Sequence, residues 1–424
     1  MPTIHQDNVN TRPNWGLAAV IIGLTMLASC SNSMFPVLGP RIMEMYELSA
    51  EQFGKTMGLR NLFRIPSLLL VGPLIGVFGP RRVAEFAMIG VAIAFLILGV
   101  GQAMLAIQVS LALFGFFNGL FSVAVPTLLI SLVPARKRGM FSVNLVAIAF
   151  PAMIYPFLAR ELLTRTENQP EYSQTIFAPF AIFGGLLLVG AIVLSFWKRE
   201  KNIIKKQPPE ASTGASPARQ NPLTEALQNV LPTLCSIQSI LVILLICLHA
   251  SADNTVYTFL PTFMENQFEN LSTRWTAWAV SVHALAYVLT RSVLAVLPEG
   301  LGQRLILTLA GPLGGSLVVV MLWSGSPMAI VELYLLASMM FAAEFPTLTS
   351  EVSSRSMGGF GTVIAAGLLL SEVATFAMLK STGKLVDNTG DYRVALSFAA
   401  CGFITFGIIA FVMGLGRQAA KDRD

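Results

Sequence analysis

The chain has 424 residues, of which 54% are hydrophobic and 12% are charged, and its formal net charge is +5. Soluble domains contain about 25% charged residues, so this composition excludes an ordinary soluble domain and indicates an integral membrane protein. The excess of basic residues does not indicate nucleic-acid binding, because these residues lie mainly in loops on one predicted side of the membrane.

The predicted fold is all-α, with about twelve membrane-spanning helices in two six-helix halves related by pseudo-twofold symmetry, since apolar runs of about 20 residues mark spanning helices. The runs of the first half cover residues 15–36, 53–75, 83–103, 108–133, 139–163 and 175–197. Those of the second half cover residues 231–262, 276–297, 305–324, 327–350, 359–383 and 392–416. A polar arm, a linker and a tail flank the two halves, which gives the segments 1–14, 15–197, 198–231, 232–416 and 417–424.

The loop charges predict the orientation of these helices. Lys and Arg gather in alternate loops and beside the termini, whereas the other loops are mostly acidic, and basic loops face the cytoplasm. We therefore expect a monomeric multi-pass protein of the plasma (inner) membrane with both termini in the cytoplasm. The first apolar run lacks a small-residue cleavage site and is interpreted as a retained helix. The cysteines fall within apolar runs and are expected to pack between helices without forming disulfides; they are Cys30, Cys235, Cys247 and Cys401.

The two halves contain an internal repeat. The Pro-Thr-Leu triplet that begins at Pro126 recurs at Pro346, 220 residues later. In the predicted inner loops the match continues at a shift of 223. The matched residues there are Gly79 with Gly302 and Arg81 with Arg304. Parallel six-helix repeats with a binding site between them are a transporter architecture.

In these features the chain resembles the major facilitator superfamily over essentially its whole length. The inner-loop signature of that family, Gly-x-Leu-Ala-Asp-Arg-x-Gly-Arg-Arg, is present in a degenerate form from Gly72 to Arg82. Gly76 replaces the usual acid of the first half, whereas Glu299 keeps an acid at the matching position of the second half. The resemblance implies a secondary transporter that works by alternating access. It also implies a gating role for the inner-loop residues Gly79, Arg81, Glu299, Gly302 and Arg304.

Two arginines, Arg60 and Arg64, lie one helical turn apart inside the second predicted helix. A charge at the bilayer centre costs about 2.5–3.5 kcal/mol and persists mainly where it faces protein or water. The repeat aligns Arg60 with His283 and Arg64 with Tyr287, and Arg291 follows on the same face of the eighth helix. We predict that these side chains line one cavity and bind an anion through the guanidinium forks. The alternative is that each arginine ties helices together.

Further polar residues extend this predicted site. Asn32 on the first helix and Asn254 on the seventh lie at equivalent depths, and Asn144 lies on a polar face of the fifth helix. These residues equally fit hydrogen bonds between helices. The predicted substrate-binding set is therefore Arg60, Arg64, His283, Tyr287, Arg291, Asn32, Asn254 and Asn144.

Three acids, Glu372, Glu344 and Asp253, also fall within apolar helices, with Glu372 the deepest. Burial favours the protonated carboxyl, whereas a nearby arginine favours the carboxylate. An acid that loses its arginine to the substrate would therefore take up a proton. We predict that these acids couple transport to protons, with Glu372 first. The alternative is that all three are permanent ion-pair partners.

One group within the superfamily is similar in more detail. Nitrate/nitrite porters bear an arginine on helix two and another on helix eight that clasp the anion. Arg291 keeps the helix-eight spacing to Glu299 and Gly302, whereas Arg64 lies about a turn out of the helix-two register. The glycine-rich signatures of helices five and eleven are absent here, so we favour an organic carboxylate over nitrate.

The leading prediction is thus a carrier of a small anion across the lipid bilayer, coupled to protons or to exchange. A proton-coupled exporter of cationic or drug-like solutes, using the three acids, is the alternative. A non-transporting sensor built on the carrier fold is a further alternative. No enzyme, cofactor or metal site is predicted, because the sequence lacks metal-spaced Cys/His clusters and phosphate-binding Gly loops.

Overall fold

The computed structural model describes residues 14–101, 103–133, 137–168, 176–197, 234–268, 271–296, 302–354 and 360–415. Over these ranges the chain is helical apart from short connections and contains no strand. Within them, twelve helical segments are long and apolar enough to cross a membrane. The predicted all-α fold with twelve spanning helices is confirmed. The bounds predicted for the arm, the linker and the tail fall almost entirely outside the described residues.

The first six spans come from eight helices, because two spans are interrupted. The break after α1 falls at Ser29, and the helix then continues through Pro36 and Pro40 to Met45. The predicted end at residue 36 was therefore wrong, since proline is tolerated within spanning helices whose neighbours satisfy the freed backbone groups. The helices are α1 (Trp15–Ala28), α2 (Cys30–Met45), α3 (Ala50–Phe78), α4 (Pro80–Val100), α5 (Met104–Leu132), α6 (Lys137–Ala152), α7 (Tyr155–Asn168) and α8 (Ala178–Phe196).

The described part of the second half also contains six spans, and one of them is irregular. The span from Gln303 to Leu322 contains a single π-turn, η3, between α12 and α13. Such π-turns are rare and often lie at functional sites. The elements are α10 (Ile237–Gln267), α11 (Thr273–Val296), α12 (Gln303–Leu305), η3 (Ile306–Ala310), α13 (Gly311–Leu322), α14 (Pro327–Ser354), α15 (Phe360–Thr389) and α16 (Tyr392–Val412).

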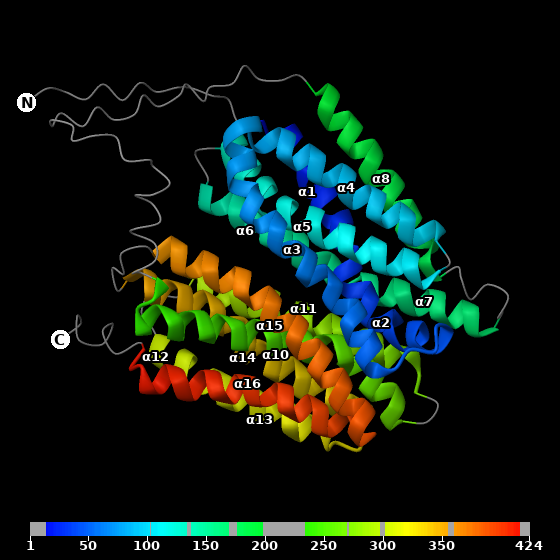
Figure 1. Cartoon of the computed structure of the whole chain (residues 1–424), viewed down its shortest axis with the longest axis vertical. Coiled ribbons are helices and arrows are strands. Elements are labelled where there is room, and N and C mark those ends of the chain that lie inside the picture. Colours follow the sequence, from blue (N-terminus) through cyan, green and yellow to red (C-terminus); the bar gives the residue numbers. More distant parts are fainter. Residues whose placement is uncertain are drawn as a thin grey trace, which may run out of the picture.

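The two halves pack side by side, with α3 lying along α15 at their boundary (Figure 1). Glycines allow this close approach, as small residues do between membrane helices. A Cβ on Gly54 would collide with the carbonyl of Leu379, and one on Gly383 would collide with the carbonyl of Ala50. Further contacts join the halves: α2 packs on α10 and α11, and α6 and α7 pack on α11.

The N-terminal end of α3 is capped by a residue of the other half. The carboxylate of Asp387 on α15 accepts hydrogen bonds from the backbone N–H groups of Ala50 and Glu51, both at 2.9 Å. A carboxylate is favourable there because the N-terminus of a helix presents free N–H groups and a partial positive charge. Asp387 therefore joins the halves at the end of α3 that is predicted to face outward.

The four cysteines differ in whether their side chains are buried in protein or exposed on the surface of the helices. Cys30 is buried and Cys247 is half-buried, whereas Cys235 and Cys401 are exposed, and all four are free thiols. The prediction that all four pack between helices is therefore wrong for Cys235 and Cys401. An apolar run does not distinguish the face of a membrane helix that meets protein from the face that meets lipid.

Candidate functional site

A cavity of about 190 Å³ lies between the halves, with walls from α2, α3 and α5 on one side and α10 on the other. Its lining is rich in amide and guanidinium groups, and it contains four of the predicted site residues. The lining residues are Asn32, Arg60, Asn61, Arg64, Phe114, Gly115, Asn118, Asn254 and Tyr257. The cavity therefore offers several hydrogen-bond donors and more than one positive charge to a small solute.

The close packing of α5 against α3 positions both arginines. A Cβ on Gly115 would collide with the carbonyl of Arg60, and one on Gly119 would collide with the hydroxyl of Ser67. Ser67 in turn donates a hydrogen bond of 2.7 Å to the carbonyl of Arg64. These contacts hold the backbone of α3 against α5 where both arginines reach the cavity.

Arg64 forms an ion pair that bridges the two halves. Its Nη1 donates to Oε1 of Glu372 on α15 at 3.0 Å, and its Nη2 donates to the hydroxyl of Ser122 on α5 at 3.3 Å. Both members of the pair are partly accessible, at 32% for Arg64 and 13% for Glu372. One of the three predicted coupling acids therefore lies beside a cavity arginine.

Arg60 faces the same cavity but forms no ion pair with any residue that the structure describes. Of the two cavity arginines, only Arg64 is thus paired with a described carboxylate, that of Glu372. The cavity wall therefore bears a net positive charge among the described side chains. The amides that accompany it, such as Asn61 and Asn118, supply neutral donors and acceptors.

The polar residues of α11 lie outside the wall of this cavity and form a separate network in the second half. The hydroxyl of Tyr287 donates to Oδ2 of Asp253 at 2.7 Å, and Nε2 of His283 lies 3.8 Å from the same oxygen. The Nδ1 atom of His283 lies 3.2 Å from the hydroxyl of Tyr334. The guanidinium of Arg291 lies over the ring of Tyr287, 4.7 Å from its centroid.

This placement differs from the expectation that helices two and eight line a common cavity. The repeat aligned α3 and α11 in depth, and their packing across the boundary is also equivalent, with α3 on α15 and α11 on α6 and α7. No residue of α11 is, however, among the described residues that line this cavity. The ring of Tyr257, which lines the cavity, lies 4.7 Å from the ring of His283 and connects the two regions. A substrate-binding role for His283, Tyr287 and Arg291 remains a prediction.

Glu344 is buried deep in the second half, away from the cavity. Its Oε2 lies 2.7 Å from Nδ1 of His249, and neither side chain is more than 9% exposed. The rings of Phe345, Phe403 and Phe406 surround the imidazole with centroids 6.2–6.4 Å away. The sequence indicated Glu344 but not its partner, because nothing in the local pattern shows that α10 and α14 meet there.

Asn144 and the predicted gating residues lie elsewhere. Asn144 on α6 is buried, and its Oδ1 has no hydrogen-bond partner in the described structure. Gly79 and Gly302 both have positive φ angles, 80° and 70°, which glycine adopts without strain. The repeat therefore places a glycine with positive φ before α4 and before α12, although the ψ angles differ, 156° at Gly79 and 5° at Gly302. Arg304 is exposed, and Glu299 lies outside the described residues.

Arg81 is paired within the first half. Its Nε donates to Oε1 of Glu85 at 2.8 Å, and its Nη2 donates to the carbonyls of Leu194 and Trp197 at the end of α8. These bonds tie the start of α4 to the end of α8. In this conformation Arg81 therefore holds two helices of one half together, and it forms no ion pair with any described residue of the other half.

Four polar lining or contact residues were missed from the sequence: Asn61, Asn118, Ser122 and Tyr257. Asn118 and Ser122 are polar residues one turn apart in an apolar helix, which is a signal that could have been read. No group of three or more His, Cys, Asp or Glu side chains that could hold a metal ion occurs in the described part of the chain.

Comparisons with known proteins agree with this architecture. The family model described as Major Facilitator Superfamily matches residues 21–366. No curated protein matches the chain. Among solved structures, a variant of the nucleoside transporter NupG is 14% identical, with 94% of this chain and 99% of that chain covered and a TM-score of 0.68.

Two further structures are similar at the same level. A D-xylose-proton symporter is 14% identical, with 95% of this chain and 97% of that chain covered and a TM-score of 0.68. A bacterial homolog of the human lysosomal transporter Spinster, inward-facing and unoccupied, is 11% identical, with 96% and 98% covered and a TM-score of 0.67. At these identities the likeness shows a shared fold, that of two six-helix halves.

Proposed function

This chain belongs to the major facilitator superfamily and is a secondary transporter in the membrane, and we propose that its substrate is a small anion, with an organic carboxylate favoured. A nitrate-like anion is compatible with the same site. The remainder of the proposal concerns how the cavity would recognise such a solute and how its movement would be driven.

The observation that supports an anionic substrate is the charge of the cavity wall. Arg60 and Arg64 both face the cavity, and Glu372 alone pairs with an arginine there. A guanidinium binds a carboxylate through two parallel hydrogen bonds, and a partly dehydrated site strengthens that attraction. A small carboxylate between Arg60 and Asn254 would neutralise the unpaired charge and bridge the two halves.

Export of a cationic solute has less support. It would require an acid on the cavity wall, whereas Glu372 is paired with Arg64, Glu344 with His249, and Asp253 is hydrogen-bonded by Tyr287. None of the three acids is among the residues that line the cavity.

A neutral polyhydroxylated solute is the second candidate, and a specific feature favours it. The cavity wall contains four asparagines, whose amides can both donate to and accept from hydroxyl groups. The structurally similar proteins include a nucleoside transporter and a D-xylose-proton symporter. For such a solute the arginines would serve as hydrogen-bond donors and the net charge would be incidental.

We further propose that transport is coupled to protons through Glu372. A substrate carboxylate that binds Arg64 would remove the arginine that stabilises the Glu372 carboxylate, and the acid would then take up a proton. The proton and the anion would cross together. Because Arg64 and Glu372 belong to different halves, the same exchange would release a bond that holds the halves together.

Uptake into proteoliposomes tests the substrate. The wild-type protein would be supplied with radiolabelled small carboxylates, nitrate, a nucleoside and a pentose, with and without an inward pH gradient. We expect accumulation of at least one anion, its loss in Arg60→Gln and partial recovery in Arg60→Lys. Accumulation of the nucleoside or the pentose without any anion would overturn the anionic proposal in favour of the second candidate.

A further inference from the structure

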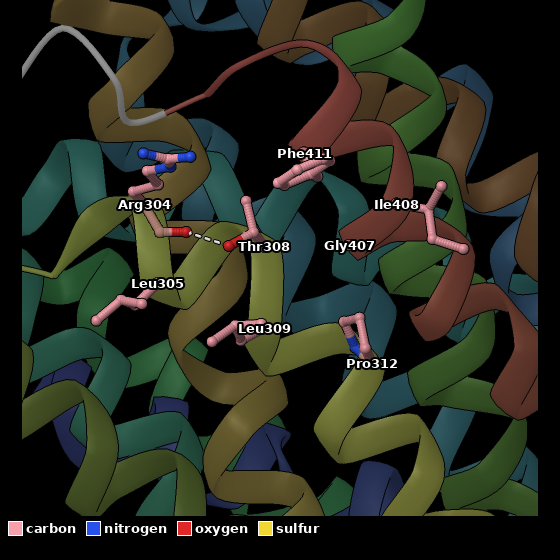
Figure 2. Close-up of a pocket in the computed structure, with 8 residues that line it drawn as sticks. All are labelled: Arg304, Leu305, Thr308, Leu309, Pro312, Gly407, Ile408 and Phe411. Carbon is pink, nitrogen blue, oxygen red and sulfur yellow. Dashed lines mark hydrogen bonds between the residues drawn. The ribbon is translucent and has the colours of Figure 1, made fainter.

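A groove of about 420 Å³ opens on the surface between the irregular span Gln303–Leu322 and α16 (Figure 2). Large apolar side chains form its rim, and they are strongly exposed: Leu305 at 63%, Ile408 at 56% and Phe411 at 55%. Its volume falls within the range of about 300–1,000 Å³ that is typical of small-molecule sites. In a spanning protein such a surface faces lipid.

The groove begins where the two helices touch. A Cβ on Gly407 of α16 would collide with the ring of Pro312 and would come within 2.8 Å of the carbonyl of Thr308. From this contact the groove extends to Arg304 and Phe411 at its other end (Figure 2). The π-turn η3 lies along this stretch and changes the register of the wall. The groove is thus part of the helix geometry and does not depend on one side-chain rotamer.

Arg304 gives the groove one charged end. Of the eight described residues that line it, Arg304 alone bears a charge, and it forms no ion pair with any described residue. The hydroxyl of Thr308 is occupied by a 2.7 Å bond to the carbonyl of Arg304. Gln303 donates a 3.3 Å bond to the hydroxyl of Ser350 on α14, which fixes the start of the span.

We propose that this groove binds one anionic phospholipid of the leaflet beside Arg304, predicted to be the cytoplasmic one. An acyl chain would lie over Leu309 and Pro312, and the phosphate would accept hydrogen bonds from the Arg304 guanidinium. A basic residue at headgroup depth above a groove between helices is the arrangement that selects anionic headgroups. A lipid supplies both the apolar tail and the negative charge that this surface complements.

Native mass spectrometry of the full-length protein tests the proposal. Protein from nanodiscs of mixed phosphatidylglycerol and phosphatidylcholine with identical acyl chains would be examined for retained lipid. We expect wild type to retain phosphatidylglycerol preferentially, and Arg304→Gln to weaken that preference about fivefold, which is the contribution of one basic residue near the surface. Leu309→Trp, which fills the groove, should reduce retention of both lipids.

Arg82→Gln is the matched control, because Arg82 is also exposed and lies at the start of α4 on the same predicted side of the membrane. The Arg82→Gln variant should retain phosphatidylglycerol over phosphatidylcholine as strongly as wild type does. An equal loss of preference in Arg82→Gln and Arg304→Gln would overturn the proposal and indicate general attraction of anionic lipid. A change from dimer to monomer in Leu309→Trp, with unchanged lipid retention, would also overturn it and assign the groove to a second copy.

Discussion

Two acid–base pairs within the helices of this protein have similar chemistry but different surroundings. Arg64 and Glu372 join the two halves beside the cavity and remain partly accessible. His249 and Glu344 lie within the second half, where Glu344 is fully buried and phenylalanines surround the imidazole. A ligand or a movement of the halves can separate the first pair, whereas the second is enclosed by one rigid bundle. Access and position between the halves are therefore the reasons for which we propose a transport role for the first pair and a structural role for the second.

The largest effect is expected at the enclosed pair, and it is an effect on stability. Removal of one member of a buried pair leaves an unsatisfied partner and costs about 3–5 kcal/mol. Glu344→Ala should therefore lower the melting temperature in detergent strongly and reduce the yield of monodisperse protein. Glu344→Gln keeps the volume and a hydrogen bond to His249, and it should recover much of the loss. A wild-type melting temperature in Glu344→Ala would contradict the structural role of this pair.

Substitution in the Arg64–Glu372 pair should instead affect transport and leave stability nearly unchanged. Arg64→Gln should leave the melting temperature nearly unchanged, because the cavity admits water, but it should reduce substrate uptake about 10–100-fold through loss of a charged hydrogen-bonding group. Arg64→Lys should recover little, since it lacks the guanidinium fork. Uptake into proteoliposomes measures both variants.

A matched control is available on α7, where Arg165 pairs with Glu161 at 3.1 Å on the exposed surface. Exposed pairs contribute little, so Arg165→Gln should transport like wild type. Unimpaired uptake by Arg64→Gln would remove the argument for an anion site at this pair. Failure of both Arg64 variants to fold would instead place Arg64 with the enclosed, structural pair.

Substitution of Glu372 should abolish coupling to the pH gradient without abolishing substrate binding. Glu372→Gln resembles the protonated acid permanently. It should retain substrate binding and exchange across the membrane but lose accumulation driven by a pH gradient, because no carboxylate remains to take up a proton. Counterflow and gradient-driven uptake, measured on the same proteoliposomes, distinguish these outcomes. Wild-type accumulation by Glu372→Gln would exclude Glu372 as the coupling acid.

The sequence was sufficient for the fold and for part of the site. Long apolar runs predicted the twelve spans, because each must cover the bilayer with its own residues. Arg60 and Arg64 could be singled out because a charge in an apolar helix is costly and needs a polar environment. The cavity contains both of them, with Asn32 and Asn254.

Contacts between distant helices could not be predicted in the same way. Glu372 is 308 residues from Arg64, and Glu344 is 95 residues from His249, so each pair depends on which helices pack together. Periodicity places a residue on a face of its helix and does not name the helix opposite. The aligned register of α3 and α11 led to the expectation of a shared cavity, although none of the described residues that line the cavity belongs to α11.

The smallest expected effect concerns the other bond between the halves, at the end of α3. Asp387 caps α3 across the boundary, whereas Asp391 caps α16 within one half, where its Oδ1 accepts from the N–H of Arg393 at 2.7 Å. Loss of a capping side chain costs about 0.5–2 kcal/mol.

Asp387→Ala should therefore shift the balance between conformations several-fold toward the one in which the end of α3 is free. Ala50 is only 3% exposed in this conformation, so alkylation of Ala50→Cys by an impermeant maleimide, in a background without Cys235 and Cys401, should become correspondingly faster. Asp391→Ala should slightly lower stability but leave this rate unchanged, because its bond does not cross between the halves. Equal alkylation rates in the two variants would show that Asp387 caps a helix without holding the halves together.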